Sequence, residues 1–158
     1  MWSAQLVYGR LATRDAKILL AGQSRGGFLS LMVAGERPSQ VKAVINFAGG
    51  WQSLQPALSE AQFKERIELH VPRLVKAAKQ FTGPSIWIYA DRDPMNREGA
   101  PRLLLDAWQS AGGHAEYLFI AEHTLPNPHL AINDASLWGR QLDAFLSLLD
   151  KRPEPAVR

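Results

Sequence analysis

The sequence predicts an α/β protein of three layers, in which a parallel sheet of about four strands lies between helices. The first observation is alternation: segments of helical periodicity separate four short apolar runs, at residues 18–21, 41–47, 86–89 and 116–120. The second is that the first run is apolar without polar alternation, as expected of a strand covered on both faces of a parallel sheet. We expect one domain over residues 1–150 and a proline-containing tail over residues 151–158.

Each element between the strands has its own signal. Apolar residues at helical spacing predict helices over residues 2–14, 28–36, 101–111 and 134–149. Residues 53–81 are expected to be helical in pieces, with Pro72 interrupting them. Gly112 and Gly113 predict the end of the 101–111 helix, and the histidine- and proline-rich segment 121–133 is expected to be a loop.

Composition excludes several classes of function. The 158 residues are 46% hydrophobic and 21% charged, which is typical of a globular domain. The formal net charge is +3 without a block of lysine or arginine, so nucleic acid is not an expected partner. The absence of cysteine excludes disulfides, cysteine–zinc sites and a cysteine nucleophile. No apolar run approaches the ~20 residues of a membrane span, and residues 1–4 do not begin a signal peptide, so the compartment stays open.

The segment Gly22–Gly26 carries the strongest chemical signal. It has the form G-x-S-x-G and lies between the first predicted strand and the first predicted helix after it, the setting of a nucleophile elbow. Such a turn exposes the serine hydroxyl, here that of Ser24, and we expect Gly22 and Gly26 to give the strand and helix room to approach. The backbone N–H of Arg25 would then point toward a developing oxyanion.

A nucleophilic serine needs a base and an acid that orients the base. Asp91 and Asp93 follow the third predicted strand, and His123 and His129 follow the fourth. The order serine, acid, histidine is that of the α/β-hydrolase triad. Because the carboxyl ends of parallel strands meet at one edge of a sheet, these residues are expected to converge, and the residues alone leave both pairs open.

Four segments together resemble one family: GQSRGG, INFAGGW, IWIYADRDP and LWGRQLDAFL. They look like the dienelactone hydrolase-like branch of the α/β-hydrolases, over about residues 15–149. The resemblance implies that Ser24 is the nucleophile, Asp93 rather than Asp91 the acid, and His129 rather than His123 the base. The family usually has glycine before that histidine, where this chain has Pro128, so His123 remains an alternative.

The resemblance covers only part of that fold, because a complete domain has ~200–250 residues and this chain matches strands five to eight. The expected fold is therefore a partial α/β-hydrolase fold that lacks the N-terminal strands, with the first predicted strand at an edge. The expected function is hydrolysis of a carboxylic ester or lactone, a small-molecule substrate, without a metal or an organic cofactor. Trp51 and Gln23 are expected to contact the substrate. The alternatives are a prolyl-oligopeptidase-type peptidase and a catalytically silent fragment that self-associates through residues 18–21.

Overall fold

A parallel four-stranded sheet forms the middle layer of the protein. The computed structural model describes residues 17–50, 59–96 and 99–151. The strands pair in the order of the sequence, and all neighbours are parallel: β1 (Ile18–Gln23), β2 (Val41–Phe47), β3 (Pro84–Ala90) and β4 (His114–Ile120). Because all strands run the same way, the segments that follow them emerge at one end of the sheet. The fold class predicted from the sequence is confirmed.

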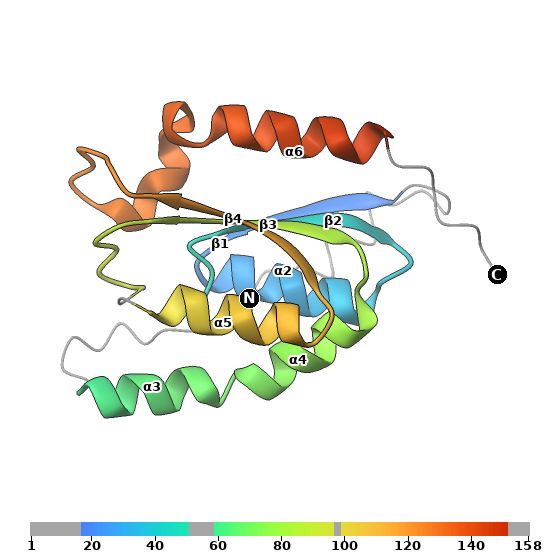
Figure 1. Ribbon diagram of the computed structural model, residues 1–158, viewed down its shortest axis with the longest axis horizontal. Coiled ribbons are helices and arrows are strands. Elements are labelled where there is room, and N and C mark those ends of the chain that lie inside the picture. Colours follow the sequence, from blue (N-terminus) through green and yellow to red (C-terminus); the bar gives the residue numbers. More distant parts are fainter. Residues whose placement is uncertain (1–16, 51–58, 97–98, 152–158) are drawn as a thin grey trace.

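Helices cover both faces of the sheet (Figure 1). One face carries α2 (Arg25–Glu36), α4 (Val71–Gln80) and α5 (Ala100–Ser110), and α3 (Glu60–Glu68) lies beyond α4 in this layer. The other face carries α6 (Gly139–Lys151) and the two short 3₁₀ helices that precede it, η1 (Pro128–Asn133) and η2 (Ala135–Leu137). The arrangement is three layers, α/β/α.

Two apolar clusters, one on each face of the sheet, hold the layers together. On the face of α2, α4 and α5, the side chains of Leu31, Leu74 and Trp108 are fully buried against the sheet. On the face of α6, Ile88 of the sheet packs in one cluster with Phe145. Full burial of such a side chain is worth about 1.5–3 kcal/mol, so these faces account for the arrangement of the helices.

The structure corrects three of the predicted elements. Pro72 does not interrupt a helix: it lies in the first turn of α4, where its missing N–H costs no hydrogen bond, and the break falls at Leu69 and His70. Residues 128–133 form η1 rather than an open loop. The last helix begins at Gly139 instead of residue 134, because Asp134 caps η2 by accepting a hydrogen bond from the Ser136 N–H. The predicted helix over residues 2–14 lies outside the described residues.

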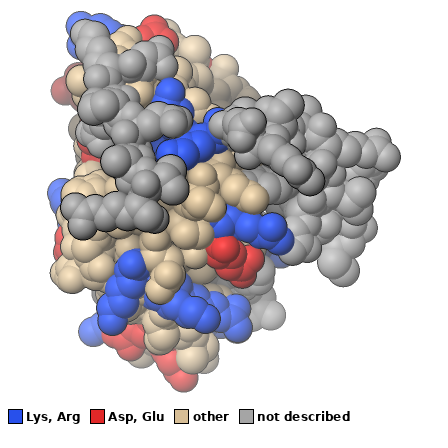
Figure 2. Space-filling view, turned by 90° about the vertical axis from the view of Figure 1, so that its right-hand side faces the viewer, with Lys and Arg blue, Asp and Glu red and all other residues tan. Residues whose placement is uncertain are grey.

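The surface at the end where the strands begin carries mixed charge. Figure 2 shows lysine and arginine side chains in separate groups, with acidic side chains next to some of them. Within the described ranges, no helix has both the length and the apolar character needed to span a membrane.

Candidate active site

Ser24 occupies a strained turn between a strand and a helix. β1 ends at Gln23 and α2 begins at Arg25, so Ser24 alone joins them, with φ of 55° and ψ of −126°. Such a backbone conformation costs a residue other than glycine on the order of 1–3 kcal/mol, so its surroundings must hold it. The Ser24 N–H donates to the Phe47 carbonyl at 2.9 Å, and the Ser24 carbonyl accepts from the Phe28 N–H at 3.2 Å. The turn that joins β1 to α2 is therefore held by β2 through the first bond and by α2 through the second.

Glycine is required at two positions around this turn, and one of them differs from the prediction. A Cβ at Gly22 would overlap the backbone of Gly26, which confirms the need for glycine at position 22. A Cβ at Gly26 would meet nothing within 4 Å. It is Gly27 that packs closely, because a Cβ there would overlap the Asn46 side chain and lie 2.9 Å from the Gly22 carbonyl oxygen. The close contact between β1 and α2 is therefore made one residue later than expected.

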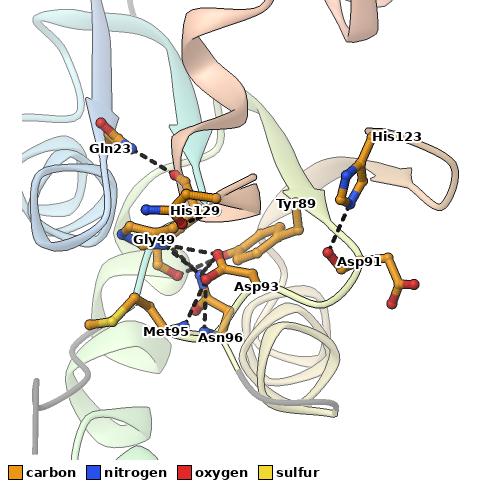
Figure 3. Close-up of polar contacts among 11 residues, drawn as sticks. Gln23, Gly49, Tyr89, Asp91, Asp93, Met95, Asn96, His123 and His129 are labelled. Atoms are coloured by element: carbon orange, nitrogen blue, oxygen red, sulfur yellow. Dashed lines mark hydrogen bonds and ion pairs between the residues drawn. The ribbon is translucent and has the colours of Figure 1, made fainter. Parts of the chain in front are cut away.

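Asp93 lies buried in the turn after β3, with 4% of its surface exposed. Its Oδ1 accepts the Met95 N–H at 2.8 Å, and its Oδ2 accepts the side-chain amide of Asn96 at 2.8 Å (Figure 3). A buried carboxylate is tolerated when its oxygens receive such hydrogen bonds. The turn thus holds the Asp93 carboxylate in a fixed position at this end of the sheet.

His129 is the partner of this carboxylate. Its Nδ1 lies 2.9 Å from Asp93 Oδ2 and 3.1 Å from Oδ1 (Figure 3). Burial by itself raises the pKa of Asp93, but hydrogen bonds from His129, Asn96 and the Met95 N–H outweigh it and hold that pKa below its ordinary value. A carboxylate that accepts from Nδ1 keeps the proton on that nitrogen and leaves Nε2 free to act as a base.

Asp91 and His123 contact each other in a different way. His123 Nε2 lies 2.9 Å from the Asp91 backbone carbonyl (Figure 3). The Nδ1 of His123 accepts the Leu125 N–H at 3.3 Å. Both ring nitrogens are therefore engaged by the backbone. The Asp91 carboxylate lies 3.6 Å from the guanidinium Nε of Arg92, on the surface. The pair that the structure brings together as carboxylate and imidazole is Asp93 and His129.

Sequence reasoning missed a buried polar network that connects the segment after β2 with β3 and the turn after it. The Tyr89 hydroxyl donates to the Gly49 carbonyl and accepts from the Asn46 amide at 3.2 Å. Burial raises the pKa of Tyr89 far above its ordinary value, which keeps the hydroxyl protonated as a donor. The Asn96 amide also donates to the Ala48 carbonyl at 3.0 Å. The one available signal was Asn46, a single uncharged polar residue within the strand VKAVINF.

The remaining predicted residues have different outcomes. The amide of Gln23 donates to the His129 backbone carbonyl at 2.8 Å, so it contacts the protein itself. Arg25 opens α2 with an exposed side chain, and Trp51 lies outside the described residues. Among the described residues no hydrogen bond joins the Ser24 hydroxyl to His129. The hydrogen bond between a nucleophile and its base is often long without substrate, so its absence does not argue against catalysis. In the same part of the chain, no group of three or more histidine, aspartate or glutamate side chains could hold a metal ion.

Comparison with known proteins gives one family and a consistent fold. The model of a family described as "Putative esterase" matches residues 4–146. A search of curated proteins gave no match. Among solved structures, a CIB-like hydrolase from Thermoplasma acidophilum is 18% identical with a TM-score of 0.57, over 90% of this chain and 57% of the other. A putative dienelactone hydrolase from Klebsiella pneumoniae is 19% identical with a TM-score of 0.56, also over 90% of this chain and 57% of the other.

An acylaminoacyl peptidase from Pyrococcus horikoshii is 16% identical with a TM-score of 0.61, over 98% of this chain and 27% of the peptidase. The chain therefore spans a little over half the length of the two hydrolases and about a quarter of the peptidase. At these identities the likeness shows the fold alone. The chain has a partial α/β-hydrolase fold.

Proposed function

The chain belongs to the family described as "Putative esterase", and from this premise we propose that it hydrolyses carboxylic ester or lactone bonds with a Ser-His-Asp triad. The observation that carries the proposal is the hydrogen bond between Asp93 and His129 at the end of the sheet where Ser24 occupies its strained turn. One end of the sheet thus offers a nucleophile, a base and an orienting acid.

The proposed reaction has two stages. His129 Nε2 takes the proton of the Ser24 hydroxyl as Oγ bonds to the substrate carbonyl carbon. The carbonyl oxygen becomes an oxyanion, and His129 returns the proton to the departing alcohol as the carbon–oxygen bond breaks. Water then attacks the acyl-enzyme, again giving its proton to His129, and the acid leaves as Ser24 is restored. Asp93 holds Nδ1 and stabilises the imidazolium during both stages.

The Arg25 N–H, at the first position of α2, would donate to the oxyanion. A helix of 12 residues carries partial positive charge at its N-terminus, which favours an anion there. Removal of one oxyanion donor typically costs on the order of 10²–10³ in rate.

Two narrower substrate classes are consistent with a Ser-His-Asp triad. The resemblance and the Klebsiella neighbour support a dienelactone hydrolase-like enzyme, whereas the acylaminoacyl peptidase neighbour supports a peptidase that uses the same triad. Trp51 remains a proposed substrate contact, whereas the Gln23 side chain, for which a substrate contact was also expected, donates its amide to the His129 carbonyl. A panel of aryl esters, a lactone and proline-containing peptides would separate the two classes, because a peptidase must also cleave the amide bonds.

Labelling with a fluorophosphonate probe tests the triad without knowledge of the substrate. We expect wild type to be labelled and Ser24→Ala to give no labelling with an unchanged circular dichroism spectrum. Asp93→Asn should lower the labelling rate by roughly 10⁴, because an amide NH2 that faces Nδ1 favours the imidazole tautomer with its proton on Nε2, which cannot act as the base. Asp91→Asn is the matched control and should stay within about threefold of wild type, since that carboxylate is on the surface. Labelling that survives in Ser24→Ala would overturn the proposal.

A second candidate function is self-association through β1, without catalysis. The sheet order makes β1 an edge of the described sheet, and Leu19 exposes 44% of its surface there. An exposed edge strand offers unpaired N–H and C=O groups to another chain. A folded chain that resists the probe and forms dimers would favour this function over hydrolysis.

A further inference from the structure

We infer that Gln23 is a positioning residue that sets the distance between the nucleophile and the base, an inference that rests on the proposed hydrolase function. Gln23 is the last residue of β1 and directly precedes Ser24. Its side-chain amide donates to the His129 backbone carbonyl at 2.8 Å, across 106 positions of sequence (Figure 3). One hydrogen bond thus ties the backbone of the proposed base to the residue next to the nucleophile.

The side of the sheet on which Gln23 lies explains the contact. Gln23 pairs in register with Phe47, and Phe47 belongs to the cluster on the face of α6 and η1. The Phe47 ring packs edge-on against Trp138 at 5.0 Å, and the Trp138 indole N–H donates to the Ala131 carbonyl of η1 at 3.0 Å. The Gln23 amide therefore meets a segment that packing already holds over the end of β1.

His129 is held at three points, and each comes from a different segment. Asp93 after β3 holds the ring nitrogen Nδ1. Asn127, just before η1, accepts the His129 backbone N–H at 3.2 Å. Gln23 holds the backbone carbonyl. Of these three contacts, the one to Gln23 comes from β1, the strand that leads directly into Ser24.

Proton transfer depends on this distance. The Ser24 hydroxyl and His129 Nε2 must come within about 2.6–3.2 Å for the proton to move, and a displacement of about 1 Å can cost on the order of 10²-fold in rate. Asp93 fixes how the imidazole turns, but the backbone of η1 decides where it lies relative to β1. The amide of Gln23 therefore acts on the reaction through His129 and does not contact the reacting atoms.

The test compares two glutamines with the same kind of hydrogen bond. Gln109 of α5 donates its side-chain amide to the Ala115 carbonyl at 3.0 Å and lies on an exposed surface. Gln23→Leu should lower the rate of fluorophosphonate labelling by roughly tenfold to a hundredfold. Gln109→Leu should label at the wild-type rate, and both variants should keep the wild-type circular dichroism spectrum.

A pH profile separates positioning from a general loss of structure. Gln23→Glu would place a carboxylate beside His129 in place of the amide, which favours the imidazolium form. We expect the acid limb of the labelling profile to move to higher pH in Gln23→Glu and to stay in place in Gln109→Glu.

The outcomes distinguish this inference from the proposed function. Unlabelled wild type would overturn the hydrolase proposal, and the role of Gln23 would fall with it. Labelled wild type, with Gln23→Leu as fast as Gln109→Leu or with an unmoved acid limb in Gln23→Glu, would overturn the inference about Gln23 alone. Slow Gln23→Leu with a shifted acid limb in Gln23→Glu would support it.

Discussion

Asp93 combines deep burial with full charge, and its hydrogen bonds explain how. Burial raises the free energy of a carboxylate, whereas hydrogen bonds from His129, Asn96 and the Met95 N–H lower it, and the net result is a pKa below the ordinary 3.8. Hydrogen bonds to charged groups contribute about 1.5–3 kcal/mol each. The residue is therefore part of the stability of this end of the sheet as well as a proposed catalytic acid.

The lowered pKa predicts how the stability depends on pH. Because the folded pKa is below the unfolded one, Asp93 contributes stability that is fully present above the ordinary value and is lost as the pH falls through the folded pKa. The difference in free energy of unfolding between wild type and Asp93→Asn should shrink between about pH 5 and pH 2. Urea unfolding of both proteins across this range measures it. A difference that stays constant, or grows as the pH falls, would contradict the assignment of Asp93 as a carboxylate that hydrogen bonds stabilise in the folded state.

At the scale of residues, the sequence pattern predicted that an acid lies at the C-terminal end of β3, but it left open whether this acid is Asp91 or Asp93. Asp91 and Asp93 follow the same strand, so the sequence pattern gives both the same position. The backbone at Arg92, with φ of 54°, separates them, since one carboxylate turns to the surface and the other inward. The hydrogen bonds of Tyr89 and Asn46 depend on which strands become neighbours, which no local pattern reports.

At the scale of elements, the turn from β1 to α2 depends on backbone contact more than on side chains. A Cβ at Gly22 would overlap the backbone of Gly26, and a Cβ at Gly27 would overlap the Asn46 side chain and crowd the Gly22 carbonyl oxygen. The sequence pattern predicted the strand, the turn and the helix, because G-x-S-x-G marks all three. It did not predict which later glycine touches the strand, since that depends on the rotation of α2.

Two alanine substitutions test this geometry. Gly22→Ala should lower the free energy of unfolding by about 1–3 kcal/mol or more, because the new Cβ overlaps the backbone of Gly26. Gly26→Ala should instead raise it by up to about 1 kcal/mol, because Gly26 lies in α2 and has room for a Cβ. Chemical unfolding monitored by tryptophan fluorescence gives both values. Equal effects of the two substitutions would contradict the close packing at Gly22.

Other elements show why sequence boundaries shift. The residues of β2 were predicted from the apolar run alone, and the structure confirms Val41–Phe47. The segment after β4 was expected to be a loop because it is rich in proline and asparagine, yet Asn127 and Asp134 use their side chains to cap the short 3₁₀ helices. Such capping depends on local hydrogen bonds that periodicity does not detect.

At the scale of the molecule, the edge strand β1 differs from the inner strands of the described sheet. β2 and β3 lie inside the sheet and are almost entirely buried, as their apolar sequences predict. β1 is as apolar in sequence, but it lies at an edge, where Leu19 and Ala21 are exposed. An apolar strand at an edge is a site for pairing with another chain, and natural proteins usually protect such strands with charge.

Lysine at position 19 therefore tests association through β1. If two chains pair along this edge, wild type should form dimers in light scattering at tens of micromolar, and Leu19→Lys should weaken them by roughly tenfold or more, because a charged side chain opposes burial of the strand. Leu69→Lys is the matched control: Leu69 exposes 68% of its surface beyond the end of α3, and its substitution should leave the dimer unchanged. A wild-type chain that stays monomeric at high concentration, or equal weakening by both substitutions, would exclude β1 as the contact.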